Sequence, residues 1–262
     1  MSTCKICSQH LILELDPEDF DETTSSTAGG SSGSVPDDLV TPCGCHFHWQ
    51  CLLDESPQIA ISMKCPSCNT SLASTPAGPS ATNNIYPTSS QQPQILTRYH
   101  NEGGVQENLD ILPLITEEAY LDANPAARPA RAYMTMCSEG DVAGIWELLR
   151  AIEEDSDEED MSPSDLLRYQ DPLDAQNTGL HLAIAQSQQE AVWLLLWLAS
   201  DLPTEVFPDE VAHAAGTLGA GRATSHGTDI RKLRNEHGLT AAEVAGSMGN
   251  TWSRLLDAGV LA

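Results

Sequence analysis

The sequence has few positive charges. Among its 262 residues only 12 are Lys or Arg, against 38 Asp or Glu, and the formal net charge is −26 at pH 7. Proteins bind nucleic acids and anionic lipid surfaces through clustered basic side chains, which displace counterions from the phosphates. We therefore expect no direct binding to nucleic acid and no electrostatic attachment to a membrane.

Long apolar runs are also missing. The longest, at 191–199, is much shorter than the roughly 20 residues that a helix needs to cross a bilayer. The first sixteen residues have neither the basic start nor the apolar stretch of a signal peptide. We expect an intracellular protein, cytoplasmic or nuclear, without a membrane partner.

Aromatic residues make up only 5% of the chain, whereas 18 residues are Gly and 16 are Pro. This composition predicts small folded units joined by disordered segments rather than one large core. Two segments fit that description, an acidic Ser/Gly-rich loop at 16–38 and a Ser/Thr/Pro/Asn/Gln linker at 71–94. A short strand is expected just before the loop, at 10–15.

Cysteines, in contrast, are concentrated near the start of the chain, and seven of the eight lie between Cys4 and Cys68. In a reducing compartment such crowding indicates metal thiolates rather than disulfides. The pattern is Cys-x2-Cys, then Cys-x-Cys-His-Phe-His-x2-Cys, then Cys-x2-Cys. Four ligands close one tetrahedral zinc site, so eight ligands predict two structural zinc ions. Cys137 stands alone, and we interpret it as a buried thiol.

This order and spacing resemble the RING finger family, over residues 1–70. The resemblance implies a small zinc-stabilised α+β domain in which ligand pairs one and three share one ion, and pairs two and four share the other. The implied ligands of the first ion are Cys4, Cys7, His48 and Cys51, and those of the second are Cys43, Cys45, Cys65 and Cys68.

Two alternatives concern this zinc domain. His46 could take the place of Cys45, but Cys45 lies three residues before His48, as in related RING fingers, and His46 and His48 are too close to serve two ions. A PHD finger has a similar ligand order but usually places Trp two residues before the seventh ligand, where this chain has Met63.

RING fingers recruit a ubiquitin-conjugating enzyme (E2) and hold its ubiquitin thioester in a reactive position, without covalent chemistry of their own. The resemblance implies an E3 ubiquitin ligase with no catalytic residue, whose E2-docking surface comprises Ile6, Leu52, Leu53 and Pro66. The chain departs from the family pattern at Glu55, often Trp, and at the linchpin position Asn69, often Arg. A non-catalytic zinc-binding scaffold or adaptor is the alternative, and a zinc-stabilised regulator that docks through its acidic loop is a third.

The C-terminal half contains an internal repeat. Thr178-Gly-Leu-His-Leu-Ala183 resembles the ankyrin signature Thr-Pro-Leu-His-x-Ala. A second copy begins at Gly238, and a third, degenerate copy begins at Gly140. The resemblance implies an all-α ankyrin solenoid at 127–262, reached through a connecting segment at 95–126, that binds a protein substrate. His181 is expected to form a hydrogen bond across the repeat turn rather than to act in catalysis.

The repeat positions that link paired helices are Gly140, Ser187 and Gly249, and they lie 47 and 62 residues apart. Because the ankyrin period is about 33 residues, both intervals must contain insertions. We expect the first to be the acidic segment 153–165. The second is either a loop with a helix at 209–218 or an unrecognisable repeat.

Overall fold

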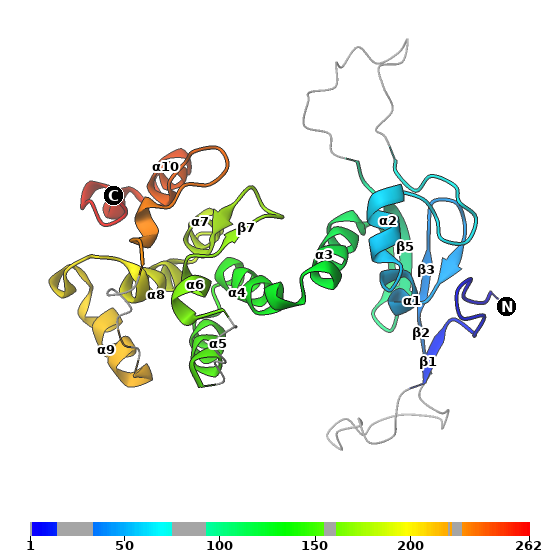
Figure 1. Ribbon diagram of the computed structural model, residues 1–262, viewed down its shortest axis with the longest axis horizontal. Coiled ribbons are helices and arrows are strands. Elements are labelled where there is room, and N and C mark those ends of the chain that lie inside the picture. Colours follow the sequence, from blue (N-terminus) through cyan, green and yellow to red (C-terminus); the bar gives the residue numbers. More distant parts are fainter. Residues whose placement is uncertain (1, 15–33, 75–92, 155–160, 220, 222–226) are drawn as a thin grey trace, which may run out of the picture. The chain divides into compact units, whose positions relative to one another are not determined.

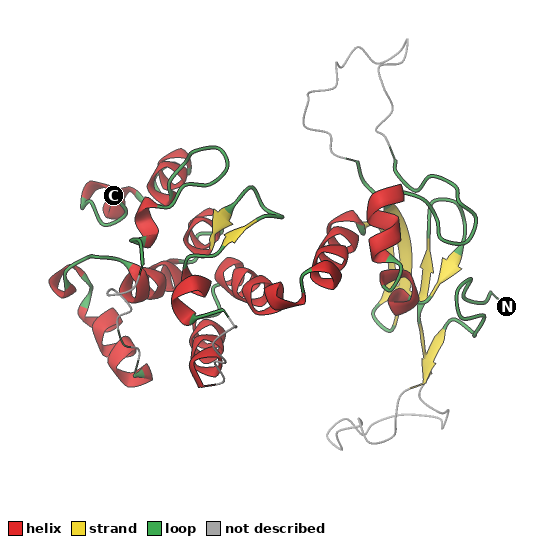
Figure 2. Ribbon diagram, viewed as in Figure 1, coloured by secondary structure: helices red, strands yellow, loops and turns green. Residues whose placement is uncertain are grey.

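The computed structural model describes residues 2–14, 34–74, 93–154, 161–219, 221 and 227–262. The chain divides into two compact units, 1–123 and 124–262 (Figure 1). The first contains both strands and helices, and the second is mainly helical (Figure 2). Most of the expected loop 16–38, most of the linker 71–94 and the centre of the acidic segment 153–165 lie outside the described residues.

The described residues of the first unit form two antiparallel sheets. Strand β1 (Ile12–Glu14) pairs with β2 (Ser34–Pro36), and a four-stranded sheet has the order β4 (His46–Phe47), β3 (Asp38–Val40), β5 (Leu96–Asn101) and β6 (Gly104–Asp110). The strand expected at 10–15 is β1. The end of the segment expected as a floppy loop differs from that expectation, because β2 and the first residue of β3 lie in it.

The described residues of the first unit also form the helices α1 (Trp49–Leu53), α2 (Ser56–Ser62) and α3 (Leu112–Ala123). Helix α3 packs against α2, and the β5–β6 hairpin pairs with β3. Residues 95–123, expected as part of a connecting segment, therefore belong to the first unit. The physical reason is apolar burial: Ile95, Ile111 and Ile115 lie in the same buried core as the ligand-bearing segment.

A buried carboxylate ties this hairpin to helix α1. Asp37 accepts hydrogen bonds from the Trp49 backbone N–H, at 3.1 Å, and from the Tyr99 hydroxyl, at 3.0 Å. The Trp49 and Tyr99 rings lie 4.7 Å apart. Burial, together with the neighbouring Asp37 carboxylate, raises the pKa of Tyr99 to about 12, so the phenol keeps the proton that it donates. Strand β5 is thereby coupled to the segment that carries the predicted metal ligands.

Replacing Tyr99 with Phe is expected to lower the free energy of unfolding of the metal-loaded first unit by about 2 kcal/mol, because Asp37 loses a charge-assisted hydrogen bond. The urea concentration at which the chain releases its metal measures this loss. Val105→Ala is the control, because Val105 is exposed on the same hairpin and its truncation is expected to cost less than about 0.5 kcal/mol. Equal urea midpoints of metal release in the Tyr99→Phe and Val105→Ala variants would contradict the coupling of β5 to the segment that carries the predicted metal ligands.

The second unit consists of short helices arranged mainly as pairs. Helix α4 packs against α7, α7 packs against α10, and α8 contacts α5, α7 and α9. The elements are η2 (Pro125–Ala127), α4 (Arg128–Glu139), α5 (Val142–Glu154), α6 (Pro163–Leu167), β7 (Gln170–Asp171), β8 (Asn177–Thr178), α7 (Gly179–Ala185), α8 (Gln189–Ala199), η3 (Thr204–Val206), α9 (Asp209–Leu218), η4 (Ile230–Lys232), α10 (Ala241–Ser247) and α11 (Ser253–Asp257).

The three predicted linking positions have the same backbone conformation. Gly140, Ser187 and Gly249 have φ values of +79°, +61° and +71°, and each lies between the two helices of a pair. A left-handed residue after a helix ends the hydrogen-bond ladder and turns the chain back. The sequence alignment on these positions therefore identifies the same turn in each helix pair.

His181 bridges successive helix pairs. Its Nδ1 lies 2.8 Å from the Thr178 hydroxyl at the start of α7, and its Nε2 lies 3.0 Å from the Leu239 carbonyl just before α10. Burial lowers the pKa of His181, so the neutral ring donates its Nε2–H to Leu239. Thr240 and Glu243 form a similar capping box at the start of α10. The expected hydrogen bond across the repeat turn is confirmed.

Both predicted insertions contain helices. The helix expected at 209–218 is α9 (Asp209–Leu218). Helix α6 begins inside the segment expected as an acidic insertion at 153–165, and it buries Leu166 and Leu167. No helix among the described residues combines the length and the apolarity needed to cross a membrane.

Candidate metal centre

Eight Cys and His side chains gather into two groups in the first unit. Within each group the ligand atoms all lie within 4.8 Å of one another. The tetrahedral Zn–S distance of about 2.3 Å corresponds to sulfurs about 3.8 Å apart, which is similar in scale. One group contains Cys4, Cys7, His48 and Cys51, and the other Cys43, Cys45, Cys65 and Cys68. The prediction of two groups able to hold metal ions is confirmed.

The two Cys-x2-Cys turns have the same backbone geometry. The Ser8 N–H donates to the Cys4 carbonyl at 3.0 Å, and the Asn69 N–H donates to the Cys65 carbonyl at 2.9 Å. Ser8 and Asn69 have φ values of +64° and +59°. Each turn thus closes through a left-handed residue directly after its second cysteine. Asn adopts this conformation more readily than most side chains, which gives Asn69 a role in the local backbone.

The His48 ring is oriented by a backbone carbonyl. Its Nε2 donates a hydrogen bond to the His10 carbonyl at 2.7 Å, which leaves the lone pair of Nδ1 available. Nδ1 lies 3.3 Å from Cys7 Sγ and 3.7 Å from Cys51 Sγ. Nδ1 is therefore the atom of His48 that could bind a metal.

His46 lies outside both groups. Its Nδ1 pairs with Asp38 Oδ1 at 2.7 Å on the neighbouring strand, whereas the Cys45 sulfur lies within the second group. The arrangement favours Cys45 over His46 as the fourth ligand in chain order. The contact between His46 and Asp38 could not be predicted from the sequence, because it arises from the pairing of β3 with β4.

Within the first group, the thiols differ in acidity. Burial would raise the pKa of Cys4, but hydrogen bonds from the backbone N–H groups of Cys7, His48 and Ile6 outweigh it and lower the pKa to about 7. Burial, reinforced by the charge of Cys4, raises the pKa of Cys51 to about 12. One thiol ionises readily, and its charge then opposes ionisation of its neighbour.

The second group shows the same contrast. The Thr70 hydroxyl, 3.3 Å from Cys68 Sγ, and the Thr70 backbone lower the pKa of Cys68 to about 6. Burial, with the adjacent sulfur of Cys68, raises the pKa of Cys45 to about 12. A divalent cation at the centre would reverse this opposition, because it attracts every thiolate at once. Both donor sets therefore fit a thiolate-binding metal ion.

The predicted docking residues differ in accessibility. Ile6 is 39% exposed in the first cysteine turn, and Leu53 and Pro66 are half-buried. Leu52 differs from the prediction, because it is 0% exposed and belongs to the core of the first unit. It faces inward on the short helix α1, so it stabilises the domain and offers no surface to a partner.

No protein-family model matches the chain, and no curated protein or solved structure does so either. The strongest observation is the pairing of ligand turns that lie far apart in the sequence.

His48→Ala is expected to reduce the bound metal from two ions to one, because the first group loses its only nitrogen ligand. His46→Ala is the matched control and should retain both ions, since its ring contacts Asp38 instead. Native mass spectrometry of the two variants measures the difference. Loss of an ion from His46→Ala with retention in His48→Ala would reverse the ligand assignment.

Proposed function

We propose that both groups bind zinc and that the chain is a RING-type E3 ubiquitin ligase. Seven thiolates and one imidazole form a donor set that favours zinc, and four ligands close each site against water. The ions would be structural, since the closed ligand sets leave no position for a reacting molecule. The protein's contribution to ubiquitin transfer is then the positioning of an E2.

The alternation of the ligand pairs carries this proposal. Pairs one and three form the first group, and pairs two and four form the second, so the two sites interlock along the chain. This is the cross-brace that the resemblance to RING fingers implies. A zinc domain built from consecutive pairs would instead place Cys4 and Cys7 with Cys43 and Cys45, which the structure keeps in separate groups.

A smaller surface than expected remains for the E2. Ile6 lies in the first cysteine turn and Pro66 in the equivalent turn of the other group, and Leu53 contributes part of its side chain from helix α1. These three residues form the proposed docking surface now that Leu52 is placed in the core. In the second unit, the stacked helix pairs and the capping boxes at Thr178 and Thr240 support an ankyrin-like array that selects a protein substrate.

An in vitro ubiquitination assay with several conjugating enzymes tests the ligase proposal. Ile6→Ala is expected to reduce chain formation about tenfold, as for the loss of a buried interface anchor. Ile61→Ala is the matched control, because Ile61 is 89% exposed in the same unit and lies outside the proposed docking surface. Absence of ubiquitin chains with every conjugating enzyme, from a chain carrying both metal ions, would refute ligase activity.

The second candidate is a non-catalytic zinc-binding scaffold, favoured by Asn69 at the position where ligases of this type often have Arg. Asn69→Arg separates the two functions. In a ligase it should speed ubiquitin transfer, because a guanidinium offers a charged, forked donor where the amide offers a neutral one. In a scaffold, neither the wild type nor the Asn69→Arg variant transfers ubiquitin.

A further inference from the structure

We propose that the second unit contains a binding pocket for a cationic side chain, Lys or Arg, of a protein partner. The pocket is a cavity of about 310 Å³ between helices α5, α8 and α9. Two tryptophans, Trp193 and Trp197, line it from α8, and Val142 and Val211 line it from α5 and α9. The inference deepens the proposed role of this unit as a substrate receptor.

A third aromatic side chain packs against the two tryptophans of the pocket. Phe207 is almost fully buried and lies against both indoles, with ring centroids 5.9 Å from Trp193 and 5.1 Å from Trp197. Both tryptophans are only half-buried despite this packing, so part of each indole borders the cavity. Tryptophan is the side chain that attracts organic cations most strongly, through the negative face of its ring.

The charged side chains that line the pocket are acidic. Glu190 in the first turn of α8 and Glu210 in the first turn of α9 both line the cavity, and both are exposed. No Lys or Arg is among the described lining residues. An apolar ligand would contact the tryptophans but gain nothing from the two carboxylates, whereas a cation on an aliphatic stem is attracted by both.

The size of the cavity suits one side chain. A volume of about 310 Å³ corresponds to about ten water molecules, at the lower limit of ligand pockets. Trp193 also borders two neighbouring hollows of about 500 and 550 Å³, which extend along α8 towards Gly140 and towards α11. The main chain of a bound partner therefore has room to continue on either side of Trp193.

The test uses the full metal-loaded chain, labelled with fluorinated tryptophan and titrated with pentylammonium, butylguanidinium or neutral pentan-1-ol. Fluorine NMR signals, assigned through Trp→Phe variants, report each indole separately. The Trp193 and Trp197 signals are expected to shift saturably with both cations, while the Trp49 signal stays constant. Pentan-1-ol should bind about tenfold more weakly, because it lacks the charge.

The charge requirement is tested with Glu190→Gln/Glu210→Gln, expected to weaken binding of both cations about tenfold. Glu139→Gln/Glu147→Gln is the matched control: it removes the same net charge from exposed positions outside the cavity and should bind as the wild type does. Equal affinity for pentan-1-ol and pentylammonium, or equal weakening by both double variants, would overturn the proposal.

A third arm identifies the source of the cation, with a blocked pentapeptide that carries one central lysine among alanines. It should shift the same two signals at least as strongly as pentylammonium does. Binding of the small cations without the peptide would overturn the assignment to a protein side chain. No ubiquitin or E2 is present, so a failure here leaves the ligase proposal intact, and a failed ubiquitination assay leaves this result unchanged.

Discussion

Removal of the proposed zinc ions is expected to unfold the described part of residues 1–123 as one unit and to leave the described part of residues 124–262 folded. Cys4 and Cys65 are ligand candidates and also members of the buried core of the first unit. Structural zinc contributes about 10–16 kcal/mol in zinc-finger peptides, which is as large as the whole net stability of a typical domain, about 5–15 kcal/mol. The second unit has a separate core and none of the eight ligands.

Hydrogen exchange before and after treatment with a chelator measures this result. Amides of β5, β6 and α3 should lose protection together with the cysteine turns, because the hairpin pairs with β3 and α3 packs on α2. Amides of α7 and α8 should keep theirs. Chelator saturated with zinc beforehand is the control. A hairpin that remains protected after the metal is removed would show that it folds independently of the ligand groups.

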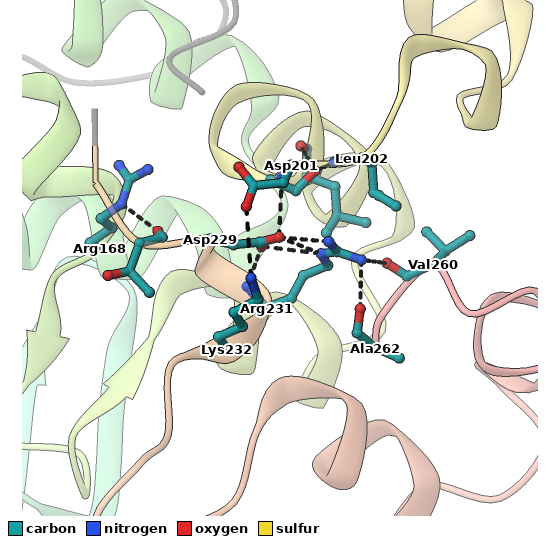
Figure 3. A network of polar contacts seen from close by, with 11 residues as sticks. Arg168, Asp201, Leu202, Asp229, Arg231, Lys232, Val260 and Ala262 are labelled. Atoms are coloured by element: carbon teal, nitrogen blue, oxygen red, sulfur yellow. Dashed lines mark hydrogen bonds and ion pairs between the residues drawn. The ribbon is translucent and has the colours of Figure 1, made fainter. Parts of the chain in front are cut away.

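Arg231→Met is expected to destabilise the second unit by about 3–5 kcal/mol, because it leaves the buried Asp229 carboxylate without its counter-charge. Asp229 accepts hydrogen bonds from the Arg231 guanidinium, at 2.6 Å for the shortest, and from the Asp201 N–H at 3.1 Å (Figure 3). Arg231 also donates to the Ala262 carbonyl at 2.6 Å. The pair thus joins the end of α8, η4 and the last residues of the chain.

The matched control is Lys232→Met, at the next position. Lys232 pairs with Asp201 at 3.8 Å, but the two side chains are 67% and 55% exposed, so this change is expected to cost less than about 1 kcal/mol. The double variant Asp229→Asn/Arg231→Met should recover part of the loss, since no uncompensated charge stays buried. Hydrogen exchange in α8 and α10 measures these losses of stability in the second unit alone, separately from the unfolding of the first unit. Equal losses of stability in the Arg231→Met and Lys232→Met variants would contradict a stabilising role of the buried Asp229–Arg231 pair.

The same pair gives stability a defined pH dependence. Burial alone would raise the pKa of Asp229, but hydrogen bonds from the Arg231 side chain and from backbone N–H groups outweigh it and lower the pKa. A carboxyl with a lowered folded pKa stabilises the fold above its unfolded value, about 3.9, and loses this contribution as the pH falls through the folded value. The cost of Arg231→Met should therefore shrink in acid.

The metal groups could be predicted from the sequence because each ligand pair is a local turn with a fixed spacing. Cys4-x2-Cys7 and Cys65-x2-Cys68 carry this information within a few residues. The hairpin at 96–110 could not be predicted in the same way. Its partner, β3, lies more than fifty residues earlier, and no local pattern specifies such a pairing.

Leu52 shows a second limit of sequence reasoning. The family pattern gives docking roles to the two residues after the sixth ligand, but one turn of α1 directs Leu52 into the core and leaves Leu53 half-exposed. Which side of α1 faces the core depends on the phase of the helix, and a helix of five residues is too short for its phase to be determined from the sequence. The pocket at Trp193 could not be predicted for a related reason, because it depends on the position of α9, which leaves a cavity beside the two tryptophans.

We propose that the two interlocked groups each bind zinc, with Cys45 rather than His46 as a ligand. Native mass spectrometry combined with zinc-edge X-ray absorption of the full chain tests it most directly. Two zinc ions per chain are expected, with seven sulfur ligands and one nitrogen ligand between them. Fewer than two ions, or six sulfur and two nitrogen ligands, would contradict it.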